Sequence, residues 1–567
     1  MQPIDVPVLI VGAGPVGVMT ALLLRRLGVA ARVVERRDRP QRAPAAHVVN
    51  ARTFEICRQA GVDMEAIAAA AKPPADAGFT YWVTKLGGEV LGRLPFERQD
   101  DDVLALTPTP LRNLSQHRFE PILLDALRAS GAQAPHFGER WESAEADADA
   151  VTSTVTEIES GRRYEVRSRY LVAADGAGSP VRKSLGIAQV GPERLQSFVM
   201  IHFAANLRPL VRDCPGVLYW VCDPDCLGTF VAHDIDHEWV FMHAWDPDRE
   251  SSEHYDTARC EALVRRALAR PDIGLAIRTI SAWVMTCQVA ERYREGRVFL
   301  VGDAAHRFPP TGGLGLNTGV QDAHNLAWKL AVVVAGTAPA TLLDTYQSER
   351  RPVGQYNAEQ SLRNAMRLLE VPRALGFSDD PHAARRGFQA VLADARRRRE
   401  VATAIANQAE HFDMLGLQLG FAYEQGALLA DGSERPVTVN PVREFVPSSR
   451  PGARLPHAWL PDRTSRRSTL DLIRLDRLTL LAGPDGGAWS EAAPGVQPAL
   501  ACVRVGVDVA DSNDWWASIA DMRPGGALLV RPDQHIAFRS RGGVADPRAV
   551  LRRAVAAALG AEPLPNP

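Results

Sequence analysis

Lysine is almost absent from this chain of 567 residues, and arginine therefore supplies nearly all of its positive charge. The only lysines are Lys72, Lys85, Lys183 and Lys329. The 65 Lys and Arg residues face 67 Asp and Glu residues, which leaves a formal net charge of -2. Without an excess of positive charge, the chain has neither the footprint of a nucleic-acid-binding protein nor a polybasic face for anionic lipid. We expect no nucleic-acid partner and no membrane partner.

Paired cysteines and long apolar runs are missing as well. None of the seven cysteines lies in a C-x-x-C pair, and no second Cys or His pair at zinc spacing follows Cys222 and Cys226. We therefore expect reduced cysteines and no metal site. No apolar run reaches the ~18 residues that a membrane span needs, and no basic segment precedes the first apolar run as it would in a signal peptide. These absences predict a cytoplasmic protein.

The length predicts more than one domain, because single hydrophobic cores stop growing near roughly 250–300 residues. A strand at 6–11, a helix ending at Leu27 and a second strand at 31–34 form a βαβ opening. Further strands are expected at 170–174 and 298–301. Aromatic and β-branched runs predict an inserted antiparallel sheet with strands at 198–204, 217–222, 229–233 and 239–244.

The second half of the chain predicts helices and then a separate domain. A long helix is expected to start near Asn317 and to cover 322–334. A polar helical stretch from 381 to about 412 contains the basic run Arg396–Arg399, which we interpret as a solvated helix face or linker. Turn-rich segments at 441–456 lead into strands at 478–481 and 527–530. This change in composition predicts a C-terminal domain.

The first strand ends in a glycine fingerprint. Gly12, Gly14 and Gly17 follow that strand and open a helix, and Glu35 ends the next strand. In a dinucleotide-binding turn, the first glycine makes the turn, the second lets the backbone approach the pyrophosphate, and the third lets the helix pack on the strand. The helix N-terminus attracts the phosphates, and Glu35 would accept hydrogen bonds from ribose hydroxyls.

Two further strands end in acidic turns, which indicate the kind of dinucleotide. Asp175-Gly176 follows one strand and Gly302-Asp303 follows the other. A glycine-rich loop then opens a second helix and includes Gly313, Leu316 and Asn317. A helix N-terminus there would stabilise the negative charge of a reduced flavin. A carboxylate such as Asp303 suits the ribityl hydroxyls of flavin, for which NAD has no equivalent.

Taken together, these three motifs resemble those of the class A FAD-dependent aromatic hydroxylases, and the phenol-hydroxylating branch is the most similar. The resemblance spans nearly the whole chain and includes AHVVNARTFEI from Ala46, GDAAHRFPPTGGLGLNTGVQDAHNLAWKLA from Gly302, LLDTYQSERRPV from Leu342 and RPGARLPHAWL from Arg450. It implies an α/β fold with a Rossmann-like FAD-binding domain interleaved with an antiparallel-sheet substrate domain, followed by a thioredoxin-like C-terminal domain. We expect the first two in residues 1–400, with the insert at about 190–285, and a linker and the third in 401–567.

The resemblance also implies the chemistry and its residues. FAD, NADH or NADPH, and O2 would act through a C4a-hydroperoxyflavin that an electron-rich aromatic carbon attacks. His47 matches the histidine proposed to deprotonate the phenol, although a simple hydrogen bond to backbone or flavin is the alternative. Pro310 fits the proline beside the flavin ring. Tyr219, Trp220 and Trp283 are candidates to line an aromatic pocket, but aromatic residues on strands are equally often core.

Two places depart from the pattern of the relatives. The relatives carry an FAD-contacting Arg where this chain has Ala45, so either Arg42 or Arg52 replaces it or the contact is lost. The acidic DLPQ segment of the relatives reads Asn113-Leu114-Ser115-Gln116 here. Gln116 would keep an FAD hydrogen bond, but loss of the Asp predicts a different pocket. Cys502 stands alone in its domain, which argues against disulfide chemistry there.

We therefore expect hydroxylation of a phenolic ring, ortho to an existing hydroxyl. A tailoring oxygenase acting on a larger polyketide or alkaloid ring is the alternative, and a flavin-binding scaffold without turnover is a third reading. Pocket volume would separate the first two, and the sequence does not give it. The expected partners are a phenolic small molecule and further copies of this chain in a homodimer or higher homo-oligomer.

Overall fold

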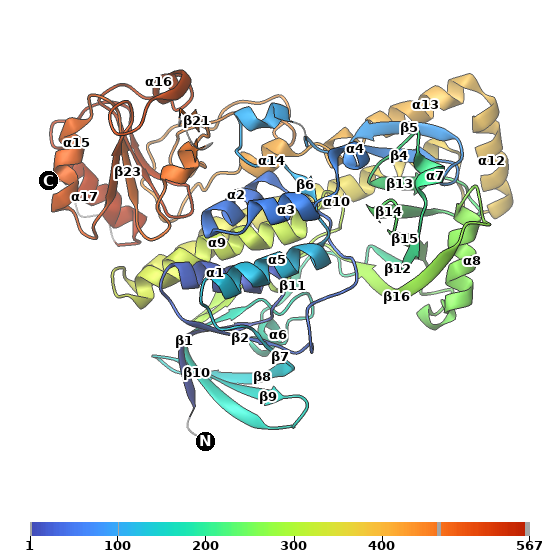
Figure 1. Cartoon of the computed structure of the whole chain (residues 1–567), viewed down its shortest axis with the longest axis horizontal. Coiled ribbons are helices and arrows are strands. Elements are labelled where there is room, and N and C mark those ends of the chain that lie inside the picture. The colour runs from blue at the N-terminus through green and yellow to red at the C-terminus, as the bar shows by residue number, and fades with distance from the viewer. Residues whose placement is uncertain (1–2, 100, 462–466, 562–567) are drawn as a thin grey trace.

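The computed structural model describes residues 3–99, 101–461 and 467–561. A central α/β unit carries a separate sheet on one side and a small C-terminal α/β unit on the other (Figure 1). In the described part of the chain, no helix combines the length and hydropathy needed to cross a membrane.

The central unit is built on a sheet with strand order β18-β19-β10-β1-β2-β7, to which β8 and β9 are joined beside β10. The strands are β1 (Ile4–Val11), β2 (Ala31–Glu35), β7 (His136–Phe137), β8 (Glu139–Ala146), β9 (Val151–Glu157), β10 (Arg163–Ala173), β18 (Arg294–Glu295) and β19 (Val298–Leu300). β1 is parallel to both β2 and β10, and β10 is parallel to β19. The carboxyl ends of β1, β10 and β19 therefore meet at one edge, which is where ligands bind to open parallel sheets.

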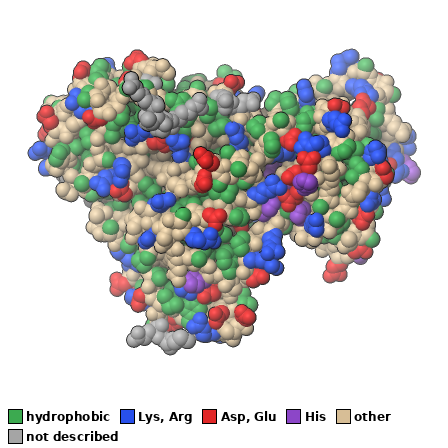
Figure 2. Space-filling view, viewed as in Figure 1, with side chains coloured by type: hydrophobic (Ala, Val, Ile, Leu, Met, Phe, Trp, Pro, Cys, Tyr) green, Lys and Arg blue, Asp and Glu red, His purple; other side chains and the backbone are tan. Residues whose placement is uncertain are grey.

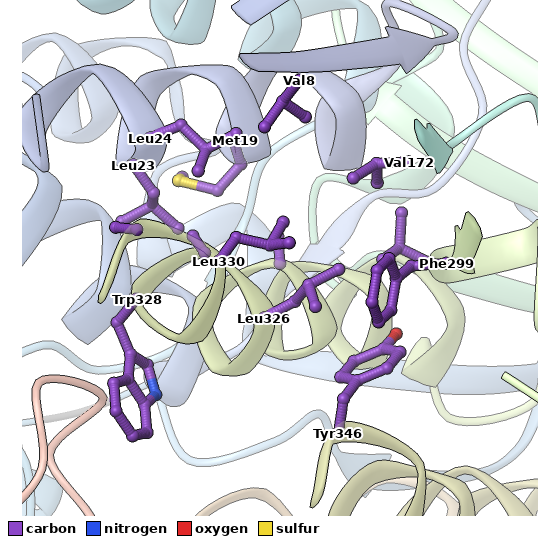
Figure 3. Close-up of a cluster of buried hydrophobic side chains, with 14 of the residues drawn as sticks. Val8, Met19, Leu23, Leu24, Val172, Phe299, Leu326, Trp328, Leu330 and Tyr346 are labelled. Atoms are coloured by element: carbon purple, nitrogen blue, oxygen red, sulfur yellow. The ribbon is translucent and has the colours of Figure 1, made fainter. Parts of the chain in front are cut away.

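Helices cover this sheet and bury most of the core. The helices nearest to the site are α1 (Pro15–Arg26), α2 (Ala51–Ala60), α5 (Gln116–Ala129), α9 (Leu314–Val334) and α10 (Asp344–Arg367). Figure 3 shows Met19 and Leu23 of α1 packing with Leu326 and Leu330 of α9, all of them fully buried. Because burying such a side chain contributes about 1.5–3 kcal/mol, this contact fixes the two helix N-termini relative to each other.

A second sheet has seven strands in the order β16-β12-β15-β14-β13-β4-β5. These strands are β4 (Phe79–Val83), β5 (Val90–Pro95), β12 (Gln196–Ala205), β13 (Leu218–Val221), β14 (Gly228–Asp234), β15 (Glu238–Trp245) and β16 (Leu275–Met285). One face packs against α8 (Thr257–Ala267). The other face packs in part against α12 (Pro381–Ala393) and α13 (Ala395–Ala406).

The inserted antiparallel sheet is present, but it draws on more of the chain than the expected insert at about 190–285. β4 and β5 come from before the insert, and β4 pairs with β13 in parallel. The exact division of the chain at residues 190, 285 and 400 stays a prediction.

The C-terminal unit has a four-stranded sheet with the order β24-β23-β25-β26. Its elements are β23 (Thr479–Ala482), α15 (Gly487–Ala492), β24 (Ala501–Arg504), α16 (Trp515–Ser518), β25 (Ala527–Val530), β26 (Ile536–Ser540) and α17 (Pro547–Ala558). β23 is parallel to β24 and antiparallel to β25, and β25 is antiparallel to β26. This βαβ unit followed by a hairpin and a helix is the expected thioredoxin-like arrangement. Cys502 lies exposed on β24 without a disulfide.

A buried cluster of charged side chains joins the C-terminal unit to the central one. Arg531 and Asp533 follow β25, whereas Lys329 lies on α9 and Glu349 on α10. Glu349 accepts hydrogen bonds from Arg531 at 2.7 and 2.8 Å and from Lys329 at 2.7 Å. The side chains of these three residues are 0% exposed. The cluster therefore anchors the C-terminal unit directly on the helix that begins at the glycine-rich loop.

The stretch expected to be helical over 381–412 is helical for most of its length, as two helices instead of one. It divides at Asp394 into α12 and α13, because the Asp394 side chain accepts from Arg396 N and Arg397 N as the N-cap of α13. An N-cap residue adopts a non-helical backbone, and a helix therefore restarts there. The shorter elements of the chain are β3 (Val48–Val49), α3 (Met64–Ala70), α4 (Pro74–Ala77), β6 (Arg112–Asn113), α6 (Pro180–Ser184), β11 (Gln189–Val190), α7 (Arg208–Val211), β17 (Gln288–Ala290), β20 (His306–Arg307), α11 (Glu370–Ala374), α14 (Leu415–Leu419), β21 (Trp459–Leu460) and β22 (Arg467–Ser468).

Candidate functional site

A cavity of about 1160 Å³ lies between the carboxyl edge of the central sheet and one face of the seven-stranded sheet. Most of the residues predicted for the site line it: Gly12, Gly14, Glu35, His47, Gln116, Asp175, Gly176, Trp220, Trp283, Asp303, Pro310, Gly313 and Leu316. Gly17, Tyr219 and Asn317 do not. Segments far apart in the sequence thus meet around one cavity.

The first glycine loop follows β1. Gly12 has φ +107°, and a Cβ there would lie 2.2 Å from the carbonyl oxygen of Ala174. A Cβ on Gly17 would lie 2.0 Å from the Gly12 oxygen, so this residue serves the packing of α1 against the loop and stands behind the cavity wall. Gly14 differs, because no atom lies within 4 Å of the position of its Cβ. The backbone at Gly14 is therefore open to the cavity, beside the N-terminus of α1.

Glu35 ends β2 at the wall of the same cavity. Its carboxylate accepts hydrogen bonds from Ala13 N at 2.9 Å and from Arg37 N at 2.9 Å. Burial opposes ionisation of Glu35, but the hydrogen bonds from Arg37 and Ala13 outweigh it and keep its pKa below the ordinary value. The side chain is thus an ionised acceptor held in place by the fingerprint loop itself.

Two more carboxylates face the cavity after β10 and β19. Asp175 accepts from Val181 N through Oδ2 at 3.1 Å, while its buried Oδ1 has no hydrogen-bond partner among the described residues. Asp303 also lines the cavity. Burial raises the pKa of the Asp175 carboxyl group, and desolvation by the surrounding protein raises that of Asp303, whose side chain is exposed at the cavity. Gln116, at the start of α5, donates to Glu120 through Nε2 at 2.7 Å and lines the cavity too.

The second glycine loop brings the N-terminus of α9 to this space. Gly313 is the N-cap residue with φ +62°, and a Cβ there would lie 2.6 Å from Cβ of Val48. Leu314, Gly315 and Leu316 follow at the cavity wall beside Pro310. The first N–H groups of an α-helix have no partner within the helix, so they are available to an electron-rich ligand atom.

Asn317 was predicted to bind the cofactor, but the structure gives it another role. Its Oδ1 accepts from Asn50 N at 2.9 Å and from Thr53 Oγ1 at 2.7 Å, and its Nδ2 donates to the oxygens of Val48 and Gly313. The amide is 1% exposed. Because its hydrogen-bonding capacity is used within the protein, Asn317 ties α9 to the loop that carries His47.

His47 precedes β3 on that loop. Its Nδ1 lies 3.0 Å from Oδ1 of Asn113, which can only accept, so Nδ1 carries the proton and Nε2 keeps its lone pair. Burial lowers the pKa of His47 to about 4, which outweighs the hydrogen bond to Asn113. A neutral imidazole at ordinary pH, lining the cavity, is the arrangement that a general base needs.

One face of the seven-stranded sheet forms the opposite wall. Trp220 and Trp283 line the cavity there. Tyr219 as a lining residue is wrong: it is buried on the other face, where its hydroxyl donates to the Cys214 oxygen at 2.9 Å. Successive side chains of a strand point to opposite faces, so neighbouring Tyr219 and Trp220 cannot both face the cavity.

The expectation for a replacement arginine is also corrected. Arg52 is 1% exposed and binds Glu55 at 2.8 Å and Gln534 at 2.7 Å, away from the cavity. Arg42 is exposed and does not line the cavity either. The arginines that line the cavity are instead Arg36, Arg37, Arg140 and Arg307.

Sequence reasoning missed two histidines of this wall. His233 on β14 lines the cavity with its Nδ1 2.5 Å from Ser115 Oγ. His411, after α13, also lines it and stacks on Phe412 with ring centroids 4.1 Å apart. Neither lies in a motif. Only the partial alternation along β14 would have marked His233 as facing the same side as Val231.

Known proteins are similar in sequence to this chain over nearly its whole length. Residues 5–361 match the FAD binding domain family, and residues 448–562 match the aromatic-ring hydroxylase C-terminal family. The chain belongs to the FAD-dependent aromatic hydroxylases. Tetracenomycin A2 monooxygenase-dioxygenase from Streptomyces glaucescens is 34% identical to this hydroxylase over 98% of this chain and 97% of its own. The same figures hold for 2,4-dichlorophenol 6-monooxygenase from Cupriavidus pinatubonensis. The structure of the flavin-dependent monooxygenase PieE with FAD and substrate matches with a TM-score of 0.91 at 35% identity, covering 98% of this chain and all of that one.

As a member of this family, the hydroxylase is a monooxygenase that uses FAD, NAD(P)H and O2. The residues around the cavity fit FAD. The open backbone at Gly14 and the α1 N-terminus suit a pyrophosphate, and Glu35 suits ribose hydroxyls. The unpartnered Oδ1 of Asp175 and the carboxylate of Asp303 are acceptors without donors of their own in the described chain, as a polyol ligand requires.

Replacing Asp303 with alanine is expected to weaken FAD binding. A charge-assisted hydrogen bond contributes about 1.5–3 kcal/mol, so the dissociation constant should rise about 10- to 150-fold. Titration of the flavin-free protein with FAD, followed by flavin fluorescence, measures it. Asp125→Ala, on the exposed face of α5, is the control. An unchanged affinity in Asp303→Ala would contradict the assignment.

Proposed function

We propose that this hydroxylase adds a hydroxyl group to a phenolic ring, ortho to the hydroxyl that the ring already carries. The observation that carries the proposal is His47, a neutral imidazole in the wall of the cavity that also contains the α9 N-terminus and Pro310. Bound FAD, once reduced, supplies an activated oxygen atom from O2 to the ring. The reaction also requires that the substrate ring be electron-rich and held in position, and residues of the protein serve both purposes.

His47 Nε2 is the acceptor for the phenol proton. A phenol has a pKa near 10, and moving its proton toward an imidazole raises the electron density at the ortho carbon. The Nδ1–H···Oδ1 hydrogen bond with Asn113 orients the ring, and Asn317 orients the backbone on which the ring stands. The aromatic faces of Trp220 and Trp283 suit a flat ring, and Met200 and Val240 add apolar surface that excludes water.

A larger polycyclic phenol, of polyketide or alkaloid type, is the second candidate. The wall on the seven-stranded sheet extends over β12, β13, β14, β15 and β16, and His411 adds a polar group there. A substrate of several fused rings would contact more of this surface than a single ring. The tetracenomycin relative supports this candidate, and the dichlorophenol relative supports a single ring.

NAD(P)H oxidation by the purified protein should accelerate when a good phenol binds. The test compares oxidation of NADH and of NADPH with and without a panel of single-ring and polycyclic phenols, with the product mass determined for each. A mass increase of one oxygen atom identifies the substrate class and the nicotinamide preference together. Equal oxidation rates with every phenol, with hydrogen peroxide as the only product, would contradict the proposal.

A further inference from the structure

A second imidazole stands beside His47 in the cavity wall. The rings of His47 and His233 meet edge to face, with centroids 5.7 Å apart. His233 is 7% exposed and its Nδ1 lies 2.5 Å from Ser115 Oγ. Asn113 and Ser115, the partners of the two histidines, both lie in the short segment where this chain departs from the pattern of its relatives. The proposed reaction at His47 assigns no task to His233.

A proton accepted by His47 has little to hold it there. Its Nδ1 partner is the neutral amide of Asn113, and the buried ammonium of Lys72 lies near enough to lower the pKa of His47 further. Lys72 is itself held by the carbonyl oxygens of Gly216 and Ala232, at 2.9 Å each. Because no carboxylate is hydrogen-bonded to His47 and a protonated Lys72 adds positive charge nearby, the imidazolium is destabilised and readily gives up its proton.

The side chains beyond His233 lead toward the surface and end at a carboxylate. The ring of His117 on α5 lies 6.3 Å from that of His233, and its Nε2 lies 3.3 Å from Glu238 Oε2. The Nδ1 of His117 is buried and has no hydrogen-bond partner in the described ranges. A buried nitrogen without a partner costs about 1–3 kcal/mol, whereas one water between the two rings would both satisfy it and link them.

Glu238 is the outermost residue of the series His233, His117 and Glu238, and it is ionised. Burial opposes ionisation of Glu238, but its contacts with His117 and His202 outweigh that and lower its pKa. Arg118 donates to it at 3.2 Å and is partly exposed. Figure 2 shows acidic, basic and histidine side chains gathered at the surface between the central unit and the seven-stranded sheet.

We propose that His233, Ser115, His117 and Glu238 form the route by which the hydroxyl proton of the substrate leaves the cavity. The inference rests on the proposed function, because that proton is the one removed from the phenol. The O–H bond of the phenol breaks as its proton bonds to His47 Nε2. The proton then passes to His233, whose tautomer Ser115 sets, and to Nδ1 of His117, where the ionised Glu238 stabilises the imidazolium until a proton is released to water. No electron moves in these steps. The charged and titratable groups around His233 are His47, Lys72, His117 and Glu238.

Replacing His233 with glutamine tests the route. The fraction of NAD(P)H oxidation that yields hydroxylated product should fall at neutral pH, by about 10-fold or more if a proton-transfer group is lost. The solvent deuterium isotope effect on hydroxylation should rise, and the loss should shrink as the pH approaches the pKa of the phenol. His237→Gln is the control, because His237 is exposed in the turn between β14 and β15 and does not line the cavity. It should behave like the parent.

A second variant separates proton transfer from a merely structural effect. Asn113→Asp places a carboxylate against His47 Nδ1, where it stabilises the imidazolium and gives the proton another place to remain. Combined with His233→Gln, it should recover at least part of the lost hydroxylation. Parent-like coupling and isotope effect in His233→Gln, or no recovery in the double variant when its FAD content is normal, would overturn the route. Failure of the parent itself to hydroxylate any phenol would instead overturn the proposed function.

Discussion

Hydroxylation should fall by about 10²- to 10⁴-fold when His47 is replaced with alanine, because that is the usual contribution of a general base. NAD(P)H oxidation should continue and yield hydrogen peroxide, since the flavin can still be reduced while the ring is not activated. FAD content should stay near that of the parent, because Gly14, Glu35 and Asp303 lie on other segments of the cavity wall. Product mass, peroxide and bound flavin measure the three outcomes.

The pH dependence separates a base from a mere hydrogen-bond partner. In the parent, hydroxylation should be lost as the pH falls through about 4, where His47 becomes protonated and Nε2 no longer accepts. In His47→Ala, hydroxylation should rise with pH toward the pKa of the phenol, near 10, because bulk water then supplies the phenolate. His243→Ala is a suitable control, since its ring bonds to the Leu227 oxygen outside the cavity. A parent-like rate and pH profile in His47→Ala would exclude the base assignment.

Replacing Glu349 with alanine should destabilise the protein severely. The change removes the carboxylate that pairs with Lys329 and one of the two carboxylates that pair with Arg531, which keeps Asp533 at 2.5 Å; both cations are 0% exposed. Breaking a buried pair in this way costs about 3–5 kcal/mol. Denaturant unfolding followed by tryptophan and flavin fluorescence measures the loss. Since α9 begins at the flavin loop and carries Lys329, bound FAD should be released early in the transition.

An exposed ion pair gives the matched control. Glu400 and Arg396 on α13 lie 3.3 Å apart with side chains 55% and 83% exposed, so Glu400→Ala should change the free energy of unfolding by less than about 1 kcal/mol.

The buried cluster around Glu349 also makes the stability of the protein depend on pH in the acid range. Arg531 and Lys329 outweigh burial and hold the pKa of Glu349 at about 2, below the ordinary 4.5 of a glutamate. Its contribution is therefore complete above 4.5 and is lost as the pH falls toward 2. Equal stability of the two alanine variants would show that the cluster contributes nothing.

The motifs on β1, β10 and β19 were readable from the sequence because each lies in one continuous strand–turn segment. Residues whose role depends on distant partners were not. An asparagine that ends a glycine-rich loop, as Asn317 does, is typical of ligand contact, yet its amide is used by Asn50, Thr53, Val48 and Gly313. Three of these partners, Asn50, Thr53 and Val48, lie 264–269 residues away in the sequence, and no local pattern indicates them.

The substrate wall illustrates the same limit. Tyr219 and Trp220 are adjacent aromatic residues in the same predicted strand, and only the register of β13 decides which one faces the cavity. His233 stands alone in its strand, and its partner Ser115 comes from the N-terminal end of α5. A single histidine carries no spacing that could point to a second one across a cavity. Pairing of β4 with β13 was equally hidden, because neither strand encodes which sheet the other joins.

That pairing has a consequence for anyone who wishes to exchange substrate preference between members of this family. The cavity wall on the seven-stranded sheet is formed mostly by residues 196–285, which suggests that this segment could be exchanged by itself. However, β13 pairs in parallel with β4, which lies in the earlier segment Phe79–Val83. Trp220 also stacks on Trp82 of that segment, with ring centroids 6.1 Å apart. A chimaera that transplants 196–285 alone would set a foreign β13 against the resident β4 and Trp82. Recombination should therefore move residues 79–95 and 196–285 together, because the strands of both segments belong to one sheet.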